Sequence, residues 1–324
     1  MQTITFSVIM PCYNSRDYVR SALDSLLGQS WPHWELVAVN DGSKDETPEI
    51  LQEYAAKDPR IRVFSKENGG YVSAVNMGLE QITGDYFLLM GSDDALAPEI
   101  FEKLAAAMED RSPDCIAFQT EIIQDGVNLG VESITQFREG AAKAGTDLAE
   151  FAAEYPEQSE IFFTRDTSKA WRREILGDLR YFGHYGLDAD GIFSMLLCHR
   201  AGSFQVMPVT GYYWTKRGDS LSGRKRSFPQ TCDCVENWIR FFREVNLKDY
   251  TLCPTEKMYL RYLIRLLQTL AEEGTCEQES LIRDAAAVIR ETAARAGYDL
   301  DLSRKDRLLL RAPRVWKRMH RLLP

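Results

Sequence analysis

Residues 86–96 read YFLLMGSDDAL, an apolar run that ends at a glycine and a serine and is followed by two carboxylates, Asp93 and Asp94. A short continuous apolar run bounded by turn residues is typical of a buried strand. The adjacent acids fit a solvated turn, and they equally fit a site for a divalent cation, because hard cations take oxygen ligands. This stretch alone leaves both interpretations open.

The same change from an apolar run to a polar loop recurs through the first 120 residues. Strands are predicted at Phe6–Met10, Glu35–Val39, Ile61–Phe64, Tyr86–Met90 and Asp114–Gln119. Between them, apolar residues recur with helical spacing at 19–27, 50–54 and 75–82. This alternation predicts an α/β fold with a mostly parallel sheet flanked by helices.

Ligands in such folds bind beyond the carboxyl ends of the strands. Small, polar or acidic loops follow four of the predicted strands, with the sequences PCYNS, NDGSKDET, KENGGY and GSDD. Because these ends meet at one edge of a parallel sheet, they predict a site for a polar ligand there.

Composition places the chain among ordinary globular proteins, with 44% hydrophobic and 27% charged residues in 324. The net charge of −9 argues against a nucleic-acid partner. The first residues do not resemble a signal peptide, and no apolar stretch reaches the roughly 18 residues of a membrane span, so we expect a cytoplasmic protein. Seven cysteines without a CxxC pair are interpreted as packing residues.

The pattern changes in the last third of the chain. We predict a first domain over residues 1–222 and a helical C-terminal region over residues 223–324, with the boundary near the polar segment RGDSLSGRKRS. Residues 303–324 carry eight Lys or Arg against one acid, interleaved with Leu and Trp. Such a basic amphipathic tail fits peripheral contact with an anionic membrane, and it equally fits packing on the preceding helices or on a second subunit.

The four loops, in this order, resemble the nucleotide-binding motifs of family 2 glycosyltransferases. TSKAWRREIL and DADGIFSMLL, further along the chain, are similar to the acceptor-side region of bacterial members that build surface polysaccharides. The resemblance covers roughly residues 5–220. It implies a GT-A fold and inverting transfer of a sugar from a nucleotide-diphosphate donor, expected to be a UDP-sugar, to a glycan or lipid-linked acceptor.

The resemblance also implies residues that bind the nucleotide sugar. Asp41 would accept a hydrogen bond from the nucleobase imide, with capping of the turn before Lys44 as the alternative. Asn76 matches a family position but could be an exposed polar residue of a helix. The remaining donor-side residues carried over are Pro11, Tyr13, Asn14, Asn68, Gly69 and Gly70.

In this family the carboxylates after the fourth strand hold Mg²⁺ or Mn²⁺ against the donor diphosphate. Asp93 is therefore the expected metal ligand, also counted among the donor-binding residues, and Asp94 is the supporting ligand. Gly91 stands where many relatives carry the first acid of an Asp-x-Asp-Asp motif. Arg217 matches a position where a cation meets the diphosphate, although a solvated loop charge is the alternative.

An inverting transfer needs a base on the acceptor side, and the resemblance places it three residues before Phe193, at Asp190. Asp188 is the second choice, and Ala189 stands where relatives often carry Glu. Asp190 as the N-cap of a helix starting at Gly191 would be compatible with that role. Trp171, on the acceptor side, either shapes an acceptor pocket or packs in the core.

Two other functions are compatible with parts of the sequence. A nucleotidyltransferase would carry a Gly-rich, basic loop after the first strand, but PCYNS has neither Gly nor Lys. A sugar-nucleotide-binding protein that has lost catalysis would explain Gly91 and Ala189. The presence of Asp41, Asp93 and Asp190 together favours the enzyme.

Overall fold

We analysed a computed structural model of the chain. The structure describes residues 3–108, 112–136, 165–184, 188–218, 226–246, 254–273, 278–313 and 316. The chain forms two compact units, Met1–Gly223 and Arg224–Pro324.

The first four strands of the first unit form a parallel sheet in the order β3-β2-β1-β4. Their bounds are β1 Phe6–Cys12, β2 Trp34–Asp41, β3 Ile61–Lys66 and β4 Tyr86–Leu89. Strand β1 is buried along nearly its whole length, and β2 is buried along all of it. This is the burial that continuous apolar runs predict for parallel strands covered on both faces.

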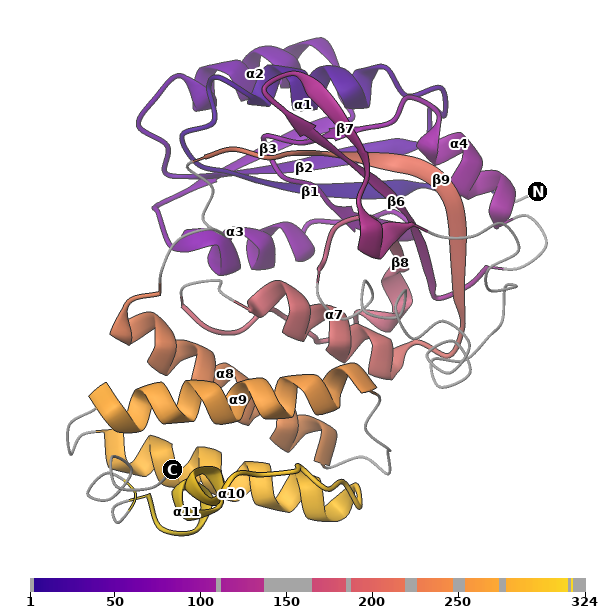
Figure 1. Cartoon of the computed structure of the whole chain (residues 1–324). Helices are drawn as coiled ribbons and strands as arrows, with labels where there is room; N and C mark the ends of the chain where they lie inside the picture. The colour runs from indigo at the N-terminus through magenta and orange to yellow at the C-terminus, as the bar shows by residue number, and fades with distance from the viewer. Residues whose placement is uncertain are drawn as a thin grey trace. The chain divides into compact units, whose positions relative to one another are not determined.

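Helices cover both faces of these strands (Figure 1). The bounds are α1 Val19–Leu27, α2 Thr47–Lys57 and α3 Gly70–Leu79, so the last ends before the predicted Ile82. The chain steps from β1 to β2 to β3 in one direction and returns past β1 to β4. Because crossovers are right-handed, this reversal puts α3 on the face opposite α1 and α2. It also makes the carboxyl ends of β1 and β4 the switch point at which such folds bind ligands.

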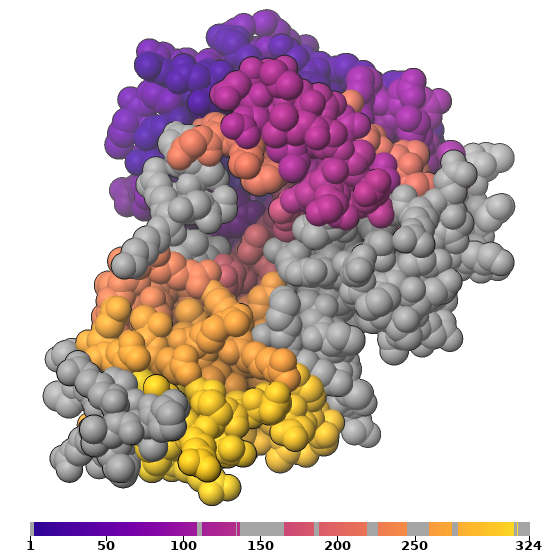
Figure 2. Space-filling model, in the orientation of Figure 1, coloured from indigo at the N-terminus to yellow at the C-terminus, as the bar shows by residue number. Residues whose placement is uncertain are grey.

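Beyond β4 the sheet becomes mixed. Strand β8, Lys169–Arg172, lies antiparallel between β4 and β6, and β9 runs parallel to β6 on its other side. Figure 2 shows the β6–β7 hairpin, in magenta, on the surface of this unit. The remaining elements are β5 Ala95–Leu96, α4 Ile100–Ala107, β6 Cys115–Gln124, β7 Val127–Val131, η1 Ser133–Thr135, η2 Arg173–Ile175, α7 Ala189–Arg200 and β9 Phe204–Thr215.

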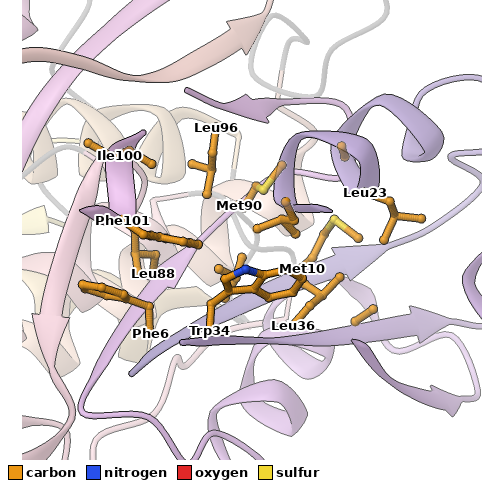
Figure 3. Close-up of a cluster of buried hydrophobic side chains, with 14 of the residues drawn as sticks. Phe6, Met10, Leu23, Trp34, Leu36, Leu88, Met90, Leu96, Ile100 and Phe101 are labelled. Atoms are coloured by element: carbon orange, nitrogen blue, oxygen red, sulfur yellow. The ribbon is translucent and has the colours of Figure 1, made fainter. Parts of the chain in front are cut away.

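The main core lies between the sheet and the layer of α1, α2 and α4 (Figure 3). Phe6 of β1 stacks on Phe101 of α4, with ring centroids 5.0 Å apart. On the other face, α3 approaches β1 so closely that a Cβ on Gly78 would lie 2.5 Å from Ile9 Cγ2. Glycine is therefore needed at position 78 to bring α3, and the loop that precedes it, close to the sheet.

The second unit is built from helices, with bounds α8 Phe228–Asn246, α9 Pro254–Glu273, α10 Glu279–Arg295 and α11 Arg304–Arg311. Trp238 of α8 is fully buried and stacks on Tyr259 of α9 at 4.4 Å. In the described part of the basic tail, Leu309, Leu310 and Trp316 are buried as well. The packing interpretation of the tail is therefore favoured for these three residues.

None of the described helices combines the length and apolar character needed to cross a bilayer. The described cysteines form no disulfide, and all of them except the half-buried Cys232 are buried.

Candidate active site

Three loops at the switch point are joined by short hydrogen bonds. The amide of Ser15, after β1, donates to Thr47 Oγ1 after β2 at 2.7 Å. The hydroxyl of Ser15 lies 2.7 Å from that of Ser92, in the loop after β4. These contacts are buried, so the three strand ends are fixed relative to one another. A polar ligand that bound here would meet a site already formed.

Asn14 joins the first two loops. Its Oδ1 accepts from the amide of Lys44 at 2.8 Å, and its own amide donates to Ser43 Oγ at 3.0 Å. Its φ of 49° is in the left-handed region, which Asn tolerates better than most residues. Pro11 is half-buried, and Tyr13 is 52% exposed. The ring of Tyr13 is therefore accessible, whereas the Asn14 side chain holds loops together.

Asp41 is 3% exposed, and its carboxylate organises the loop before α3. It accepts from the amides of Gly69 at 2.9 Å and Gly70 at 2.8 Å, and from Lys66 Nζ at 2.9 Å. These bonds satisfy amides at the helix start, and the helix dipole favours a carboxylate there. The turn-capping alternative for Asp41 is wrong, because Asn40 Oδ1 accepts the Ser43 amide in that turn.

Two glycines let the loops after β2 and β3 meet. A Cβ on Gly42 would lie 2.7 Å from the amide nitrogen of Asn68, and Gly42 has a φ of 69°. Gly70 has a φ of 82°. Side chains rarely adopt these values, so both positions require glycine. The Asn68 side chain completes the contact by donating from Nδ2 to the carbonyl of Asp41 at 2.9 Å.

Asn76 uses its side-chain amide to hold Tyr181. Its Nδ2 donates to the carbonyl of Tyr181 at 2.9 Å, and its Oδ1 accepts from the amide of Tyr181 at 2.8 Å. Asn76 is half-buried, so the exposed-residue alternative is wrong. The contact fastens the segment that follows η2, which contains Tyr181, to α3.

The two acids after β4 have different environments. Asp94 is 7% exposed, and its oxygens accept from the Tyr212 hydroxyl at 2.6 Å and the Thr215 amide at 2.8 Å. Burial, followed by the charge of Asp93, raises the pKa of Asp94 to about 7. Asp94 is thus bound to β9, and Asp93 is the carboxylate better placed to meet a ligand.

Asp93 pairs with Arg217, whose Nε lies 3.1 Å from Asp93 Oδ2. The guanidinium also lies over the ring of Tyr18, 4.6 Å from its centroid. The solvated-loop interpretation of Arg217 is therefore wrong, because the residue holds an ion pair and a cation–π contact. A Cβ on Gly91 would lie 2.5 Å from Asp94 Oδ2 and 2.8 Å from Asp93 Oδ1, so an acid at position 91 would require these two carboxylates to move.

The donor set fits a divalent cation in a restricted way. In the part of the chain that the structure describes, no three or more His, Cys, Asp or Glu side chains are grouped to hold a metal ion. Mg²⁺ in phosphate sites is commonly bound by one or two carboxylates, with substrate phosphates and water completing its shell. Asp93 fits that pattern, whereas both oxygens of the buried Asp94 already accept a hydrogen bond, one from Tyr212 and one from Thr215.

Helix α7 begins at Ala189, two residues before the predicted start at Gly191. Asp188 is its N-cap residue, with a left-handed φ of 61°, and Asp190 lies in its first turn. The N-cap interpretation of Asp190 is therefore wrong. Asp190 Oδ1 accepts from the amide of Gly191 at 2.8 Å. Burial, and then the charge of Asp166, raise the pKa of Asp190 to about 7, which suits a general base near neutral pH.

Two charged residues next to Asp190 were missed by the sequence reasoning. Asp166 is 4% exposed, and Lys169 is fully buried. Burial lowers the pKa of Lys169 to about 8. The available signal was that Lys169 immediately precedes the apolar pair Ala170–Trp171, which a strand would bury. Trp171 is itself fully buried in β8, so it packs in the core.

Residues 7–180, more than half of the chain, match the family model described as "Glycosyl transferase family 2". The chain belongs to glycosyl transferase family 2. This membership confirms the family that the motifs indicated.

Relatives of this family 2 member include two Bacillus subtilis proteins. One is TuaG, named for teichuronic acid biosynthesis, which is 44% identical over 107 residues, covering 33% of this chain and 42% of TuaG. The other is the glycosyltransferase EpsH, 35% identical over 112 residues, covering 35% of this chain and 33% of EpsH. The matches thus span less than half the length of these relatives.

The fold is similar to that of S. aureus TarS residues 1–349, solved in complex with UDP-GlcNAc. The TM-score is 0.71 at 23% identity, over 98% of this chain and 92% of that one. The complex of the same TarS fragment with UDP gives a TM-score of 0.69. The likeness confirms the predicted α/β fold with a helical C-terminal part.

Proposed function

We propose that this family 2 member transfers a sugar from a UDP-sugar to a glycan or lipid-linked acceptor in the synthesis of a bacterial surface polysaccharide, with inversion at the anomeric carbon. The observation that carries the proposal is that the first turn of α3 makes hydrogen bonds to both sides of the candidate site. Gly70 donates to Asp41 on the nucleotide side, and Tyr71 donates to Asp166 beside Asp190 on the acceptor side. A donor and an acceptor bound on these two sides would therefore be held next to each other by the start of α3.

In this proposal Asp190 is the general base. It takes the proton of the acceptor hydroxyl as that oxygen attacks the anomeric carbon, and the nucleoside diphosphate leaves with the electrons of its bond to the sugar. Because its pKa is raised to about 7, the ionised Asp190 carboxylate is a stronger base than a solvated carboxylate. The relative named for teichuronic acid biosynthesis supports the choice of surface polysaccharide.

Asp41, Asn68, Gly69 and Gly70 form the proposed nucleotide side, together with Pro11, Tyr13 and Asn14. Asp41 already accepts from three donors. Because a carboxylate has about four lone-pair sites, one remains for a nucleobase N–H. The solved TarS complexes with UDP and UDP-GlcNAc support a uridine donor.

Asp93 would hold Mg²⁺ or Mn²⁺ together with the donor diphosphate, and the bound ion would neutralise charge on that diphosphate. Arg217, which pairs with Asp93 in this structure, would then be released toward the phosphates. Because Gly91 has no side chain, the carboxylate ligands that this loop could supply to the ion are those of Asp93 and Asp94.

Calorimetry with UDP and UDP-GlcNAc, in Mn²⁺ and in EDTA, tests the donor and the cation. We expect binding in Mn²⁺ and little or none in EDTA. Undiminished affinity in EDTA would remove the metal from the proposal. If uridine nucleotides do not bind and another nucleotide sugar does, the proposed donor is wrong. Release of UDP on addition of candidate glycan acceptors would test catalysis against a binding protein without activity.

From the exposed basic residues of the tail we also propose peripheral contact with an anionic membrane. Arg304, Arg307 and Arg311 of the described tail are exposed, whereas its apolar residues Leu309 and Leu310 are buried. Contact through charge alone would fall steeply with salt. Co-sedimentation with anionic and zwitterionic vesicles, at low and high salt, checks this, and equal pelleting with both vesicle types would contradict it.

A further inference from the structure

Asp166 lies in the segment just before β8 and is held by two tyrosines. Its Oδ2 accepts a hydrogen bond from the Tyr71 hydroxyl at 2.6 Å and another from the Tyr181 hydroxyl at 2.5 Å. The two rings meet edge to face, with centroids 6.0 Å apart. Tyr71 belongs to the first turn of α3, and Tyr181 belongs to the segment that Asn76 fastens to α3. The carboxylate is thus tied to α3 at two points.

The same segment is packed on the helix that carries Asp190. The ring of Tyr181 stacks on Phe193 with centroids 4.0 Å apart, and Ser194 Oγ donates to the carbonyl of Arg165 at 2.6 Å. Phe193 and Ser194 follow Asp190 by three and four residues, so all three share one face of α7. Asp166 and its tyrosines therefore lie against the face on which Asp190 is placed.

Charged and polar groups from several neighbouring segments act on Asp190. The carboxyl groups of Asp166 and Asp188 raise the pKa of Asp190, the amino group of Lys169 lowers it, and the pKa values of the Tyr71 and Tyr181 hydroxyls are themselves raised, by burial first and then by Asp166. Lys169 is fully buried and donates from Nζ to the carbonyl of Arg165. Among the charged neighbours, Asp166 acts most strongly on Asp190 after the effect of burial itself.

A buried carboxylate is costly, and an apolar residue would fill the same space more stably if packing were its only role. Two hydroxyl donors on one oxygen keep Asp166 in place next to another acid, where like charges repel. We propose that Asp166 is a positioning residue for Asp190: gripped by Tyr71 and Tyr181, it fixes the first turn of α7 against α3 and supplies the negative charge that Asp190 faces. This inference rests on the proposed role of Asp190 as the base.

Carbon-13 NMR of the aspartate carboxyls in the full chain tests the inference without substrate. The signal of Asp190 is identified by its loss in Asp190→Asn, and its titration is followed from pH 4 to pH 9 in the wild type, Asp166→Asn and Lys169→Met. We expect the midpoint of Asp190 to fall by about one pH unit in Asp166→Asn, roughly a tenfold loss of proton affinity, because a like charge is removed. In Lys169→Met the midpoint rises.

Asp178→Asn is the matched control, since Asp178 is an exposed acid that pairs with Arg200 at the last residue of α7. It should leave the Asp190 midpoint unchanged. If Asp166→Asn does not fold, the Asp190 midpoints of the wild type and Lys169→Met are compared instead, because they show whether Asp190 responds to the buried charges around it. An unmoved midpoint in the folded variants, or a wild-type midpoint near 4, the range of a solvated aspartate, would overturn the inference.

The transfer rate of Asp190→Asn separates this inference from the proposed function. Loss of transfer in that variant, with an unmoved midpoint in Asp166→Asn, overturns only the role of Asp166. A shifted midpoint in Asp166→Asn, with full transfer in Asp190→Asn, overturns instead the assignment of Asp190 as the base on which the inference rests.

Discussion

The nucleotide side and the acceptor side of the candidate site differ in how they are held together. On the nucleotide side, small polar side chains after parallel strands bond to one another and to backbone amides, as Ser15 does with Thr47 and Ser92. On the acceptor side, charged side chains are buried together, and Asp166, Lys169 and Asp190 affect one another's charge. The first side is held mainly by hydrogen bonds at the strand ends, with ion pairs at Asp41 and Asp93, whereas the second is held by charged groups that are buried together. Substitutions on the two sides should therefore have different signatures.

The largest effect should come from the acceptor side. Asp190→Asn removes the proposed base and should lower the transfer rate about 100-fold to 10,000-fold. Donor affinity should stay close to that of the wild type, because the donor loops do not contain Asp190. Initial rates of UDP release, with calorimetry of UDP binding, check both expectations. Asp188→Asn is the paired control and should cost much less; a larger loss there would move the base to Asp188.

On the nucleotide side, Asp93→Ala should weaken binding of UDP in Mn²⁺ about 10-fold to 100-fold, and transfer should be lost with it, because the proposed metal ligand is removed. Calorimetry measures the change. Asp17→Ala is a suitable control, since Asp17 is an exposed acid paired with Arg16. Equal UDP affinity of the wild type and Asp93→Ala in Mn²⁺ would show that Asp93 is not the metal ligand.

The pH dependence of transfer at saturating donor should report the ionisation of Asp190, the proposed base. Asp190 acts as a base only when ionised, and its pKa is raised to about 7, so the rate should fall about tenfold per pH unit as the pH drops below 7. The same shift has a cost in stability: a carboxyl whose folded-state pKa is raised destabilises the fold as the pH rises from about 4 to 7. Asp190→Asn should accordingly melt higher than the wild type at pH 8, with little difference at pH 4.

The smallest change should come from loosening the nucleotide side without touching a charge. The Tyr212 hydroxyl donates to Asp94 and accepts from the amide of Gly91 at 3.0 Å. Tyr212→Phe leaves a buried acceptor and a donor without this partner and should lower the free energy of unfolding by about 1–3 kcal/mol. Urea unfolding measures the loss, and Tyr213→Phe on the same strand is the control. A neutral Tyr212→Phe would mean that Asp94 finds another donor.

The same contrast explains how far the sequence could be interpreted. Continuous apolar runs predicted β1 to β4, and the loops after them could be assigned to one edge because parallel strand ends meet there. The partners of Asp41 could not be predicted, since its contact with Lys66 depends on the register of β2 on β3 and its contact with Gly69 on the path of the loop after β3. Strand β8 has four residues, too few for a pattern, and its antiparallel place between β4 and β6 follows from packing. Asp166 lies in a polar stretch, which indicates a surface loop until the tertiary structure buries it, and for Lys169 the signal was the apolar pair that follows it.

The ion pair between Asp93 and Arg217 bears on the order in which ligands arrive. A lone divalent ion approaching Asp93 must displace a guanidinium that already balances the carboxylate, and it brings no new acceptor for that guanidinium. An ion that arrives already chelated by a nucleoside diphosphate brings phosphate oxygens to which Arg217 can transfer. Steady-state kinetics should therefore follow an ordered scheme in which the cation–donor complex is the binding species. Metal affinity measured on the donor-free protein should correspondingly underestimate the affinity in the ternary complex.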